Sequence, residues 1–168
     1  MAAGNQVFIG VDIGGTKIGV NGIDGARKPL SGEWTEVPSN SHIGPGATVQ
    51  QIVVGLKTFL SRMGMTMDQV SGLGVDSPGP ADINGRIERS ANMHPDWEGF
   101  QLRDRTEDAI VKEVGRSVPV VYENDCNAAG LWESFVGDPS GKEVMFLLAP
   151  GTGLGGGIVI NGRLLRGA

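Results

Sequence analysis

The sequence predicts an α/β protein in which strands open the chain and helices then alternate with further strands. Two apolar, strand-like runs lie on either side of the Gly14-Gly15 pair, and an alternating run over residues 30–37 predicts a third strand. Glycine adopts positive φ without a Cβ clash, so a Gly-Gly pair between two strands favours a tight β-hairpin. We therefore expect three antiparallel strands at the start of the fold.

The remaining elements follow from apolar spacing. Apolar residues at helical spacing predict helices over about residues 47–63, 104–114 and 128–135. The second of these helices has Asp104 as its predicted N-cap, with Glu107 three residues later. Short apolar runs predict strands over residues 70–75, 118–122, 144–148 and 158–160, and Asn-Gly pairs predict tight turns at residues 84–85 and 161–162.

Composition argues against several classes of protein. Lys and Arg number 14 against 19 Asp and Glu, and the resulting net charge of −5 argues against a nucleic-acid or anionic membrane partner. No apolar run approaches the roughly 20 residues of a membrane span, and no secretory signal is visible at the N-terminus. Cys126 is the only cysteine, which fits a reducing compartment. We expect a cytoplasmic protein.

The first glycine hairpin carries groups that suit a phosphate ligand. Gly14, Gly15 and Thr16 offer backbone N–H groups and a hydroxyl, Lys17 offers a cation, and Asp12 a carboxylate. Such donors with one acid suit a magnesium-bound polyphosphate. The pattern is not a Walker loop, because that motif opens a helix and here a strand follows. An ordinary glycine hairpin remains the alternative.

A second glycine-rich stretch covers residues 151–157 and includes a Gly-x-Gly-x-x-Gly pattern. A Rossmann dinucleotide site would need a helix after this pattern and an acidic residue about 20 positions later. A strand follows instead, so we interpret the stretch as a second glycine hairpin that grips the phosphate chain from the other side, with Thr152 adding a hydroxyl. A structural glycine turn is the alternative.

Asp125 is the candidate catalytic carboxylate. It lies just past a predicted strand, where a helix begins, and Asn124 and Asn127 flank it. Asparagine both donates and accepts hydrogen bonds, which suits a polyhydroxylated ligand. Asp125 could then take the proton of a sugar hydroxyl that attacks a γ-phosphate. The alternative is a helix N-cap. Glu123 is either a second hydroxyl partner or a surface charge.

Taken together, five segments of the sequence resemble the ROK family of sugar kinases and sugar-responsive repressors. They occur in the family's order and cover nearly the whole chain. They are Asp12-Ile-Gly-Gly-Thr-Lys17, Ser77-Pro-Gly-Pro-Ala-Asp82, Asn92-Met-His-Pro-Asp-Trp97, Glu123-Asn-Asp-Cys-Asn-Ala-Ala129 and Gly151-Thr-Gly-Leu-Gly-Gly-Gly-Ile-Val-Ile-Asn-Gly162.

The resemblance implies an actin-like ATPase fold built from two ribonuclease-H-like lobes. Residues 1–121 would form the N-terminal lobe and residues 122–168 the beginning of the second lobe. The resemblance also implies ATP-dependent phosphorylation of a hexose at its 6-hydroxyl, an activity of glycolysis, with the glucokinase branch as the nearest likeness.

The resemblance also assigns roles to individual residues. Asp125 would be the catalytic base, and Asp12 would sit at the Mg²⁺ ion that accompanies ATP. Sugar contacts would come from Asn124, Asn92 and Gly79. The phosphate loops would be formed by Gly14, Gly15, Thr16 and Lys17, and by Thr152, Gly153 and Gly155.

The sequence departs from the family pattern in what it lacks. A Gly-Glu-x-Gly-His sugar segment, a cysteine-rich zinc motif and the adenine-binding helices are absent, so zinc, the remaining sugar contacts and homodimer formation are expected only of a full-length parent. We expect the chain alone to bind ATP poorly and to expose a sheet edge. Asp76 stands where the family pattern has a small residue.

Several functions stay open at this level. The hexose could be N-acetylmannosamine, N-acetylglucosamine, fructose or allose instead of glucose, and polyphosphate could replace ATP. A sugar-sensing repressor is disfavoured, because Asp12 lies too close to Met1 for a preceding helix-turn-helix domain. A catalytically incomplete fragment that only binds sugar or a partner is the third alternative.

Overall fold

The computed structural model describes residues 6–89, 94–137, 144–151 and 153–166. The chain divides into two compact units, Met1–Glu123 (unit 1) and Asn124–Ala168 (unit 2). Among the described residues, none of the helices combines the length and apolar character needed to cross a membrane.

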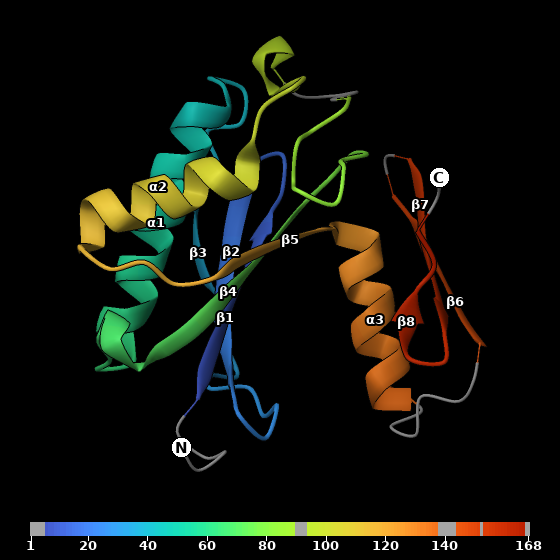
Figure 1. Cartoon of the computed structure of the whole chain (residues 1–168), viewed down its shortest axis with the longest axis horizontal. Coiled ribbons are helices and arrows are strands. Elements are labelled where there is room, and N and C mark those ends of the chain that lie inside the picture. The colour runs from blue at the N-terminus through green and yellow to red at the C-terminus, as the bar shows by residue number, and fades with distance from the viewer. Residues whose placement is uncertain (1–5, 90–93, 138–143, 152, 167–168) are drawn as a thin grey trace. The chain divides into compact units, whose positions relative to one another are not determined.

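Unit 1 is built on a five-stranded mixed sheet with the order β3-β2-β1-β4-β5 (Figure 1). Strand β2 is antiparallel to both β1 and β3, whereas β4 is parallel to β1. Alternation in β1 buries Ile9, Val11 and Ile13 on one face. The strands are β1 (Val7–Ile13), β2 (Lys17–Asp24), β3 (Thr35–Pro38), β4 (Val70–Ser77) and β5 (Val120–Asn124).

Helices α1 (Pro45–Arg62) and α2 (Leu102–Val114) lie side by side over one face of this sheet (Figure 1). Pro45 occupies the first turn of α1, where its missing N–H has no intrahelical partner to lose. Gly115 ends α2 in the left-handed conformation, with φ of 76°. Short 3₁₀ helices cover Met67–Gln69 (η2) and Pro95–Trp97 (η3).

The core of unit 1 lies between the two helices and the sheet. Its largest side chains are almost completely buried, so this unit holds a full hydrophobic core. They are Ile9, Ile13, Ile18, Ile52, Leu56, Phe59, Leu73, Ile87, Trp97, Leu102 and Ile110.

Unit 2 places helix α3 (Asp125–Gly137) against a three-stranded antiparallel sheet of order β6-β7-β8 (Figure 1). The strands are β6 (Val144–Pro150), β7 (Leu154–Ile160) and β8 (Arg163–Leu164). The close approach depends on glycine at position 157 of β7, because a Cβ added there would lie 2.7 Å from Cys126 O of α3. Val159 is fully buried, whereas Val144, Phe146 and Leu148 alternate along β6 as exposed residues.

The predicted order of elements is confirmed, including the three antiparallel strands at the start. The third strand is shorter than predicted, because Arg62 of α1 donates to Glu33 O at 2.7 Å and to Ser31 Oγ at 3.2 Å and holds residues 31–33 outside the sheet. The prediction of Asp104 as a helix cap is wrong. Gln101 is the N-cap of α2, and Asp104 lies in its first turn, where it pairs with Arg103.

Two boundaries in unit 2 also differ from the predictions. Helix α3 begins at Asp125 rather than at residue 128. Strand β7 begins at Leu154 rather than at residue 158, so Gly155, Gly156 and Gly157 are strand residues and not part of a loop. The predicted second glycine hairpin is confirmed, because β6 and β7 pair antiparallel as far as Pro150 and Leu154, but its turn is shorter than the glycine-rich stretch of residues 151–157.

Candidate functional site

The turn at residues 14–17 joins β1 to β2 and is closed by a hydrogen bond from Gly14 N to Lys17 O at 2.9 Å. Neither Gly14 nor Gly15 uses positive φ, contrary to the expectation for this hairpin. Gly14 is needed for space, because a Cβ there would lie 3.1 Å from Lys17 O, whereas a Cβ at Gly15 would meet nothing within 4 Å. Gly15 and Thr16 are exposed and open to a ligand.

Hydrogen bonds connect the same turn to the segment that follows β3. Ser39 Oγ and Ser41 Oγ donate to the Gly15 carbonyl at 3.0 and 2.6 Å, and Ser39 N donates to Thr16 O at 3.0 Å. Both serines are buried. Within the part of the chain that the structure describes, no hydrogen bond is made by the backbone N–H of Gly15 or Thr16. These two donors are thus available to an anion.

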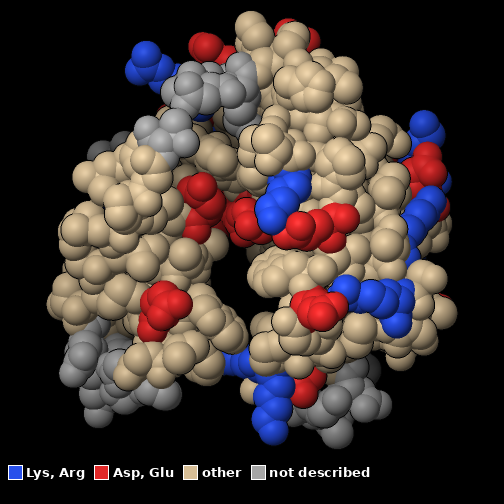
Figure 2. Space-filling view, turned by 180° about the vertical axis from the view of Figure 1, so that it is seen from behind, with Lys and Arg blue, Asp and Glu red and all other residues tan. Residues whose placement is uncertain are grey.

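The ammonium of Lys17 already has an acidic partner. It contacts the Glu36 carboxylate on the neighbouring strand β3, and both side chains are more than half exposed. On the face drawn in Figure 2, Lys and Arg side chains lie singly or beside acidic ones. An exposed pair of this kind contributes about 0–1 kcal/mol, so a phosphate could draw Lys17 away at little cost.

Asp12 is the last exposed residue of β1, and an acidic residue for which no role was predicted lies beside it. Asp76 of β4 is its partner in the strand register. Val11 and Val75, and likewise Ile13 and Ser77, are buried, so Asp12 and Asp76 lie together on the opposite face of the sheet. The two carboxylates therefore form a pair beside the turn at residues 14–17, which we call the phosphate turn because of the ligand proposed for it.

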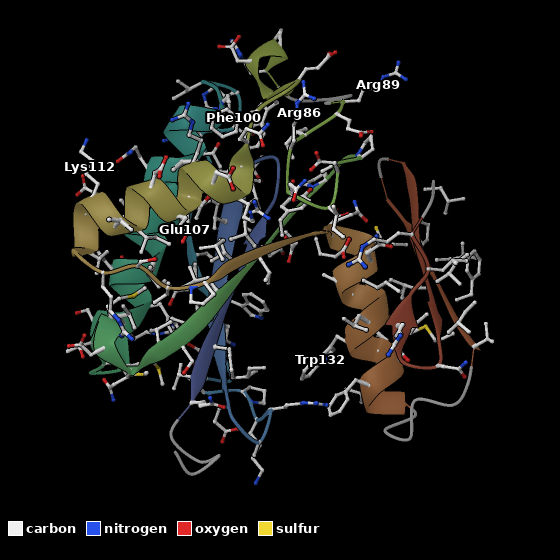
Figure 3. The ribbon with its side chains drawn as sticks, viewed as in Figure 1. Arg86, Arg89, Phe100, Glu107, Lys112 and Trp132 are labelled. Carbon is white, nitrogen blue, oxygen red and sulfur yellow. The ribbon has the colours of Figure 1, made fainter. Side chains whose placement is uncertain are left out.

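Gly79 lies in a loop whose shape only glycine can adopt. Its φ is 93°, and a Cβ there would lie 2.8 Å from Arg89 O. Asp82 Oδ1 accepts from Asn84 N and Arg86 N and shapes the predicted tight turn, in which Gly85 has φ of 76°. Arg86 and Arg89 belong to this segment (Figure 3). Asn92, the other predicted sugar ligand here, lies outside the described residues.

In unit 2 the cap and the candidate base are neighbouring residues. Asn124 Oδ1 accepts from Cys126 N at 3.1 Å and Asn127 N at 3.2 Å, so Asn124 caps α3. Asp125 Oδ1 accepts from Cys126 N at 2.7 Å and from Asn124 Nδ2 at 2.9 Å. The Cys126 thiol also makes a hydrogen bond to the Asp125 carboxylate. The capping alternative applies to Asn124.

The second glycine segment has two parts with different surroundings. Gly151 N donates to Gly153 O at 2.8 Å in the turn, where a Cβ on either glycine would meet nothing within 4 Å. In the strand, a Cβ on Gly155 would lie 2.3 Å from Cys126 Sγ, and one on Gly157 would lie 2.7 Å from Cys126 O. Gly155 and Gly157 thus allow α3 to pack on β7. Thr152 lies outside the described residues.

Cys126 follows Asp125 and is half-buried between α3 and β7. Burial raises the pKa of its thiol, and the negative charge and hydrogen bond of Asp125 raise this pKa further. Its thiolate form is therefore disfavoured. Trp132 of the same helix lies on the face turned away from the β6–β8 sheet and is 40% exposed (Figure 3).

The structure groups the predicted residues by unit. Asp12 and residues 14–17 gather at one end of β1 and β2, and Asn124 and Asp125 adjoin at the start of α3. Within the described parts of the chain, no three His, Cys, Asp or Glu side chains cluster as a ready metal site. Sequence reasoning missed Ser39, Ser41 and the pairing of Asp76 with Asp12. No local pattern marks them, because burial and strand register bring them to the site.

Comparison with known proteins places this geometry in a family. Residues 8–168 match the ROK family profile. A glucokinase of Halalkalibacterium halodurans is 33% identical over 161 residues, which are 95% of this chain and 46% of the relative. The structure of a ROK family glucokinase from Streptomyces griseus in complex with glucose and AMPPNP is 32% identical, with TM-score 0.76 over 96% of this chain and 47% of that one.

A third similar protein is an inorganic polyphosphate/ATP-glucomannokinase from an Arthrobacter species. It is 28% identical, with TM-score 0.77 over 98% of this chain and 62% of that one. The chain spans about half the length of the curated relatives it matches. The profile match and these structures confirm the predicted actin-like ATPase fold, with its ribonuclease-H-like strand order in unit 1. The chain belongs to the ROK family.

Proposed function

We propose that this chain belongs to an ATP-dependent hexose kinase that phosphorylates the 6-hydroxyl of glucose, with Asp125 as the general base. The observation that carries the proposal is the arrangement of the Asp125 carboxylate. Its Oδ1 is held by Asn124 Nδ2 and Cys126 N, which orients the carboxylate, and a carboxylate offers about four acceptor sites, so lone pairs remain for a further partner. A base must be oriented and must keep one lone pair free for the proton it takes.

The reaction that fits these groups is phosphoryl transfer. As the sugar hydroxyl oxygen bonds to the γ-phosphorus, Asp125 Oδ2 takes the hydroxyl proton, and the bond from that phosphorus to the bridging oxygen breaks. ADP leaves with the electron pair of that bond. Most of the lowering of the barrier comes from alignment and from neutralising charge on the phosphate oxygens.

The first glycine hairpin supplies the donors for those oxygens. The N–H groups of Gly15 and Thr16 are exposed and unbonded within the described chain, and the Thr16 hydroxyl and the Lys17 ammonium lie in the same turn. Gly153 and Gly155 are proposed to contribute backbone donors from unit 2. Gly79, Asn92, Glu123 and Asn124 are proposed to contact the sugar.

The residues present also fit Mg²⁺, which supplies charge neutralisation when it accompanies ATP. Magnesium is usually held by one or two carboxylates together with phosphate oxygens and waters, so a cage of protein ligands is not required. Asp12 and its register partner Asp76 present two carboxylates on one face beside the phosphate turn. Asp12 is the proposed magnesium contact, with Asp76 in reach of the same ion or its waters.

Glucose and ATP are the proposed substrates because the similar Streptomyces griseus glucokinase is described in complex with glucose and AMPPNP. Two alternatives keep support. Polyphosphate is a possible donor, since the Arthrobacter relative is named for both polyphosphate and ATP. Other hexoses are possible acceptors, since the Arthrobacter relative is named a glucomannokinase.

An assay of sugar-phosphate formation with a panel of hexoses tests the proposal, because this product forms with either donor. It should be run on the 168-residue chain and on a longer protein that contains it, with ATP or polyphosphate as donor. Turnover of glucose with ATP supports the proposal. Turnover of another hexose alone corrects the substrate, and turnover with polyphosphate alone corrects the donor. Sugar binding without turnover in either protein contradicts the kinase assignment and favours a sugar-binding role.

A further inference from the structure

Two buried serines and a buried tryptophan form a hydrogen-bonded series beneath the phosphate turn of unit 1. Ser39 and Ser41, which we call the serine clamp, both donate their hydroxyls to the Gly15 carbonyl, at 3.0 and 2.6 Å. Trp97 Nε1 donates to the Ser41 carbonyl at 3.1 Å. The three residues are 0%, 4% and 0% exposed, so water does not compete for these bonds.

The serine clamp determines the direction of one particular N–H group. A trans peptide is planar, so the carbonyl of Gly15 and the N–H of Thr16 point in opposite directions. The clamp holds this carbonyl toward the interior, which leaves the Thr16 N–H pointing out of the protein. Two donors occupy both lone pairs of the carbonyl. Rotating this peptide would leave the two buried hydroxyl protons without their acceptor, which is strongly unfavourable.

Trp97 extends this arrangement to a second part of the site. It ends the 3₁₀ helix Pro95–Trp97, which follows directly in sequence the segment that carries the predicted sugar ligand Asn92. Its indole holds the backbone of Ser41, and its ring packs edge-on against Phe100 with centroids 6.1 Å apart. The turn at residues 14–17 and the 3₁₀ helix Pro95–Trp97 are thus connected through one buried side chain.

We propose that Ser39 and Ser41 are positioning residues that aim the Thr16 N–H at the phosphate chain of the donor, with Trp97 holding Ser41 in place. The proposal rests on the proposed function, because it assumes that the phosphate chain binds at this turn. The clamp residues touch no ligand themselves and act through the Gly15–Thr16 peptide.

Titration of the isotope-labelled 168-residue chain with magnesium tripolyphosphate tests the proposal. The amide signals of Gly15 and Thr16 report binding at the turn. The double variant Ser39→Ala with Ser41→Ala should bind tripolyphosphate roughly tenfold more weakly than the wild-type chain does. This is the effect expected when about one hydrogen bond to a charged group is no longer aligned. Ser41→Thr keeps the hydroxyl and should bind like the wild type.

Thr48→Val is the matched control. It also removes a buried hydroxyl of unit 1 that donates to a backbone carbonyl, that of Gly44 at 3.4 Å, but this bond lies in the first turn of α1. Urea unfolding of each variant measures the stability that each lost hydroxyl contributes. A positioning role predicts weaker binding only in the clamp variants, even where the control loses equal stability. If the double variant does not fold, Ser41→Ala alone carries the same test.

The possible outcomes separate this proposal from the proposed function. Equal affinity of the wild-type and clamp variants overturns the positioning role and leaves the kinase proposal intact. Equal weakening in Thr48→Val shows a merely structural role and also overturns it. If tripolyphosphate moves neither the Gly15 nor the Thr16 amide, in the 168-residue chain or in a longer protein that contains it, the assignment of this turn to phosphate is wrong, and the positioning proposal is wrong with it.

Discussion

The two glycine-rich segments look alike in sequence but differ in what their glycines do. In unit 1, Gly14 and Gly15 form an exposed turn whose shape is held by Ser39 and Ser41. In unit 2, only residues 151–153 form a turn, and Gly155 and Gly157 are strand residues on which α3 packs. The first segment is thus an exposed turn, which we propose as a ligand surface, whereas the second is largely a packing surface that supports the helix carrying Asp125.

The difference shows that glycine content alone does not reveal whether a glycine leaves room for a ligand or for a packed helix. Both require the absence of a Cβ, because both bring other atoms close to the backbone. What separates them is the nature of the neighbour, which is open space at Gly15 and the backbone of Cys126 at Gly157.

The largest effect is expected at the residue that the second segment supports. Asp125→Asn removes the proton acceptor but keeps the shape and the hydrogen bond to Cys126 N. Turnover should fall by a factor on the order of 10² to 10⁴ while sugar affinity stays nearly unchanged. Steady-state kinetics and sugar titration of an active protein that contains the chain measure both quantities.

Asp108→Asn is the matched control for this prediction, since it neutralises an exposed carboxylate of α2 whose ion-pair partner is Arg105 at 3.9 Å. It should leave turnover unchanged. If Asp125→Asn retains wild-type turnover, Asp125 is not the base, and the second glycine segment supports a helix without a catalytic residue.

Gly157→Ala should destabilise unit 2. Its Cβ would lie 2.7 Å from Cys126 O and 3.2 Å from Asn127 Cα, and these backbone atoms cannot move without shifting α3. Overpacking of this kind costs about 1–3 kcal/mol. Faster amide hydrogen exchange within α3 and β7, with unit 1 unaffected, is the expected observation.

Gly153→Ala provides the control within the same segment, because its Cβ would meet nothing within 4 Å. It should leave exchange in unit 2 close to that of the wild type. Equal effects of the two substitutions would contradict the distinction between the turn and the strand of this segment.

Thr16→Ala tests the first segment as a ligand surface. Loss of its hydroxyl should raise the KM for ATP roughly tenfold, as expected for one hydrogen bond to a charged group, and should leave the KM for the sugar unchanged. Thr58→Ala, which removes an exposed hydroxyl bonded to Val54 O on α1, should change neither constant. A change confined to the sugar would refute the assignment of this turn to phosphate.

The smallest effect concerns the thiol that packs on Gly155. Burial and the Asp125 carboxylate raise the pKa of Cys126, so the thiol should react with iodoacetamide more slowly at pH 8 than a free thiol. Asp125→Asn should accelerate this reaction, because it removes the charge contribution to the pKa. Wild-type reactivity equal to that of a model thiol would contradict the packing of Cys126 against β7.

The raised pKa of Cys126 also predicts how the stability of unit 2 changes with pH. A thiol whose pKa is raised in the folded chain favours folding while it is protonated. This contribution is complete below the pKa of the unfolded thiol and is lost as the pH rises through the folded-state pKa. Cys126→Ser should therefore reduce the alkaline dependence of unit 2 stability, measured by urea unfolding across this pH range.

Much of the fold could be predicted because its signals are local. Apolar periodicity marks β1, β2 and α1, and Gly64 and Gly115 with positive φ mark where helices end. The short third strand could not be predicted, because residues 31–33 continue the alternating pattern of a strand in the sequence. In the folded chain, Arg62, which is far away in sequence, binds polar groups of these residues. The start of α3 was missed because Asn124, rather than an apolar residue, determines it.

The sequence by itself determined the family, the order of the elements and the candidate residues, because motif order and periodicity are properties of the chain alone. Only the tertiary structure decided that Ser39 and Ser41 hold the phosphate turn, that Asp76 lies beside Asp12, and that Gly157 serves packing. Each of these depends on which distant residue is the neighbour. Strand register, burial and helix packing determine that neighbour, and none of them is encoded within a single segment.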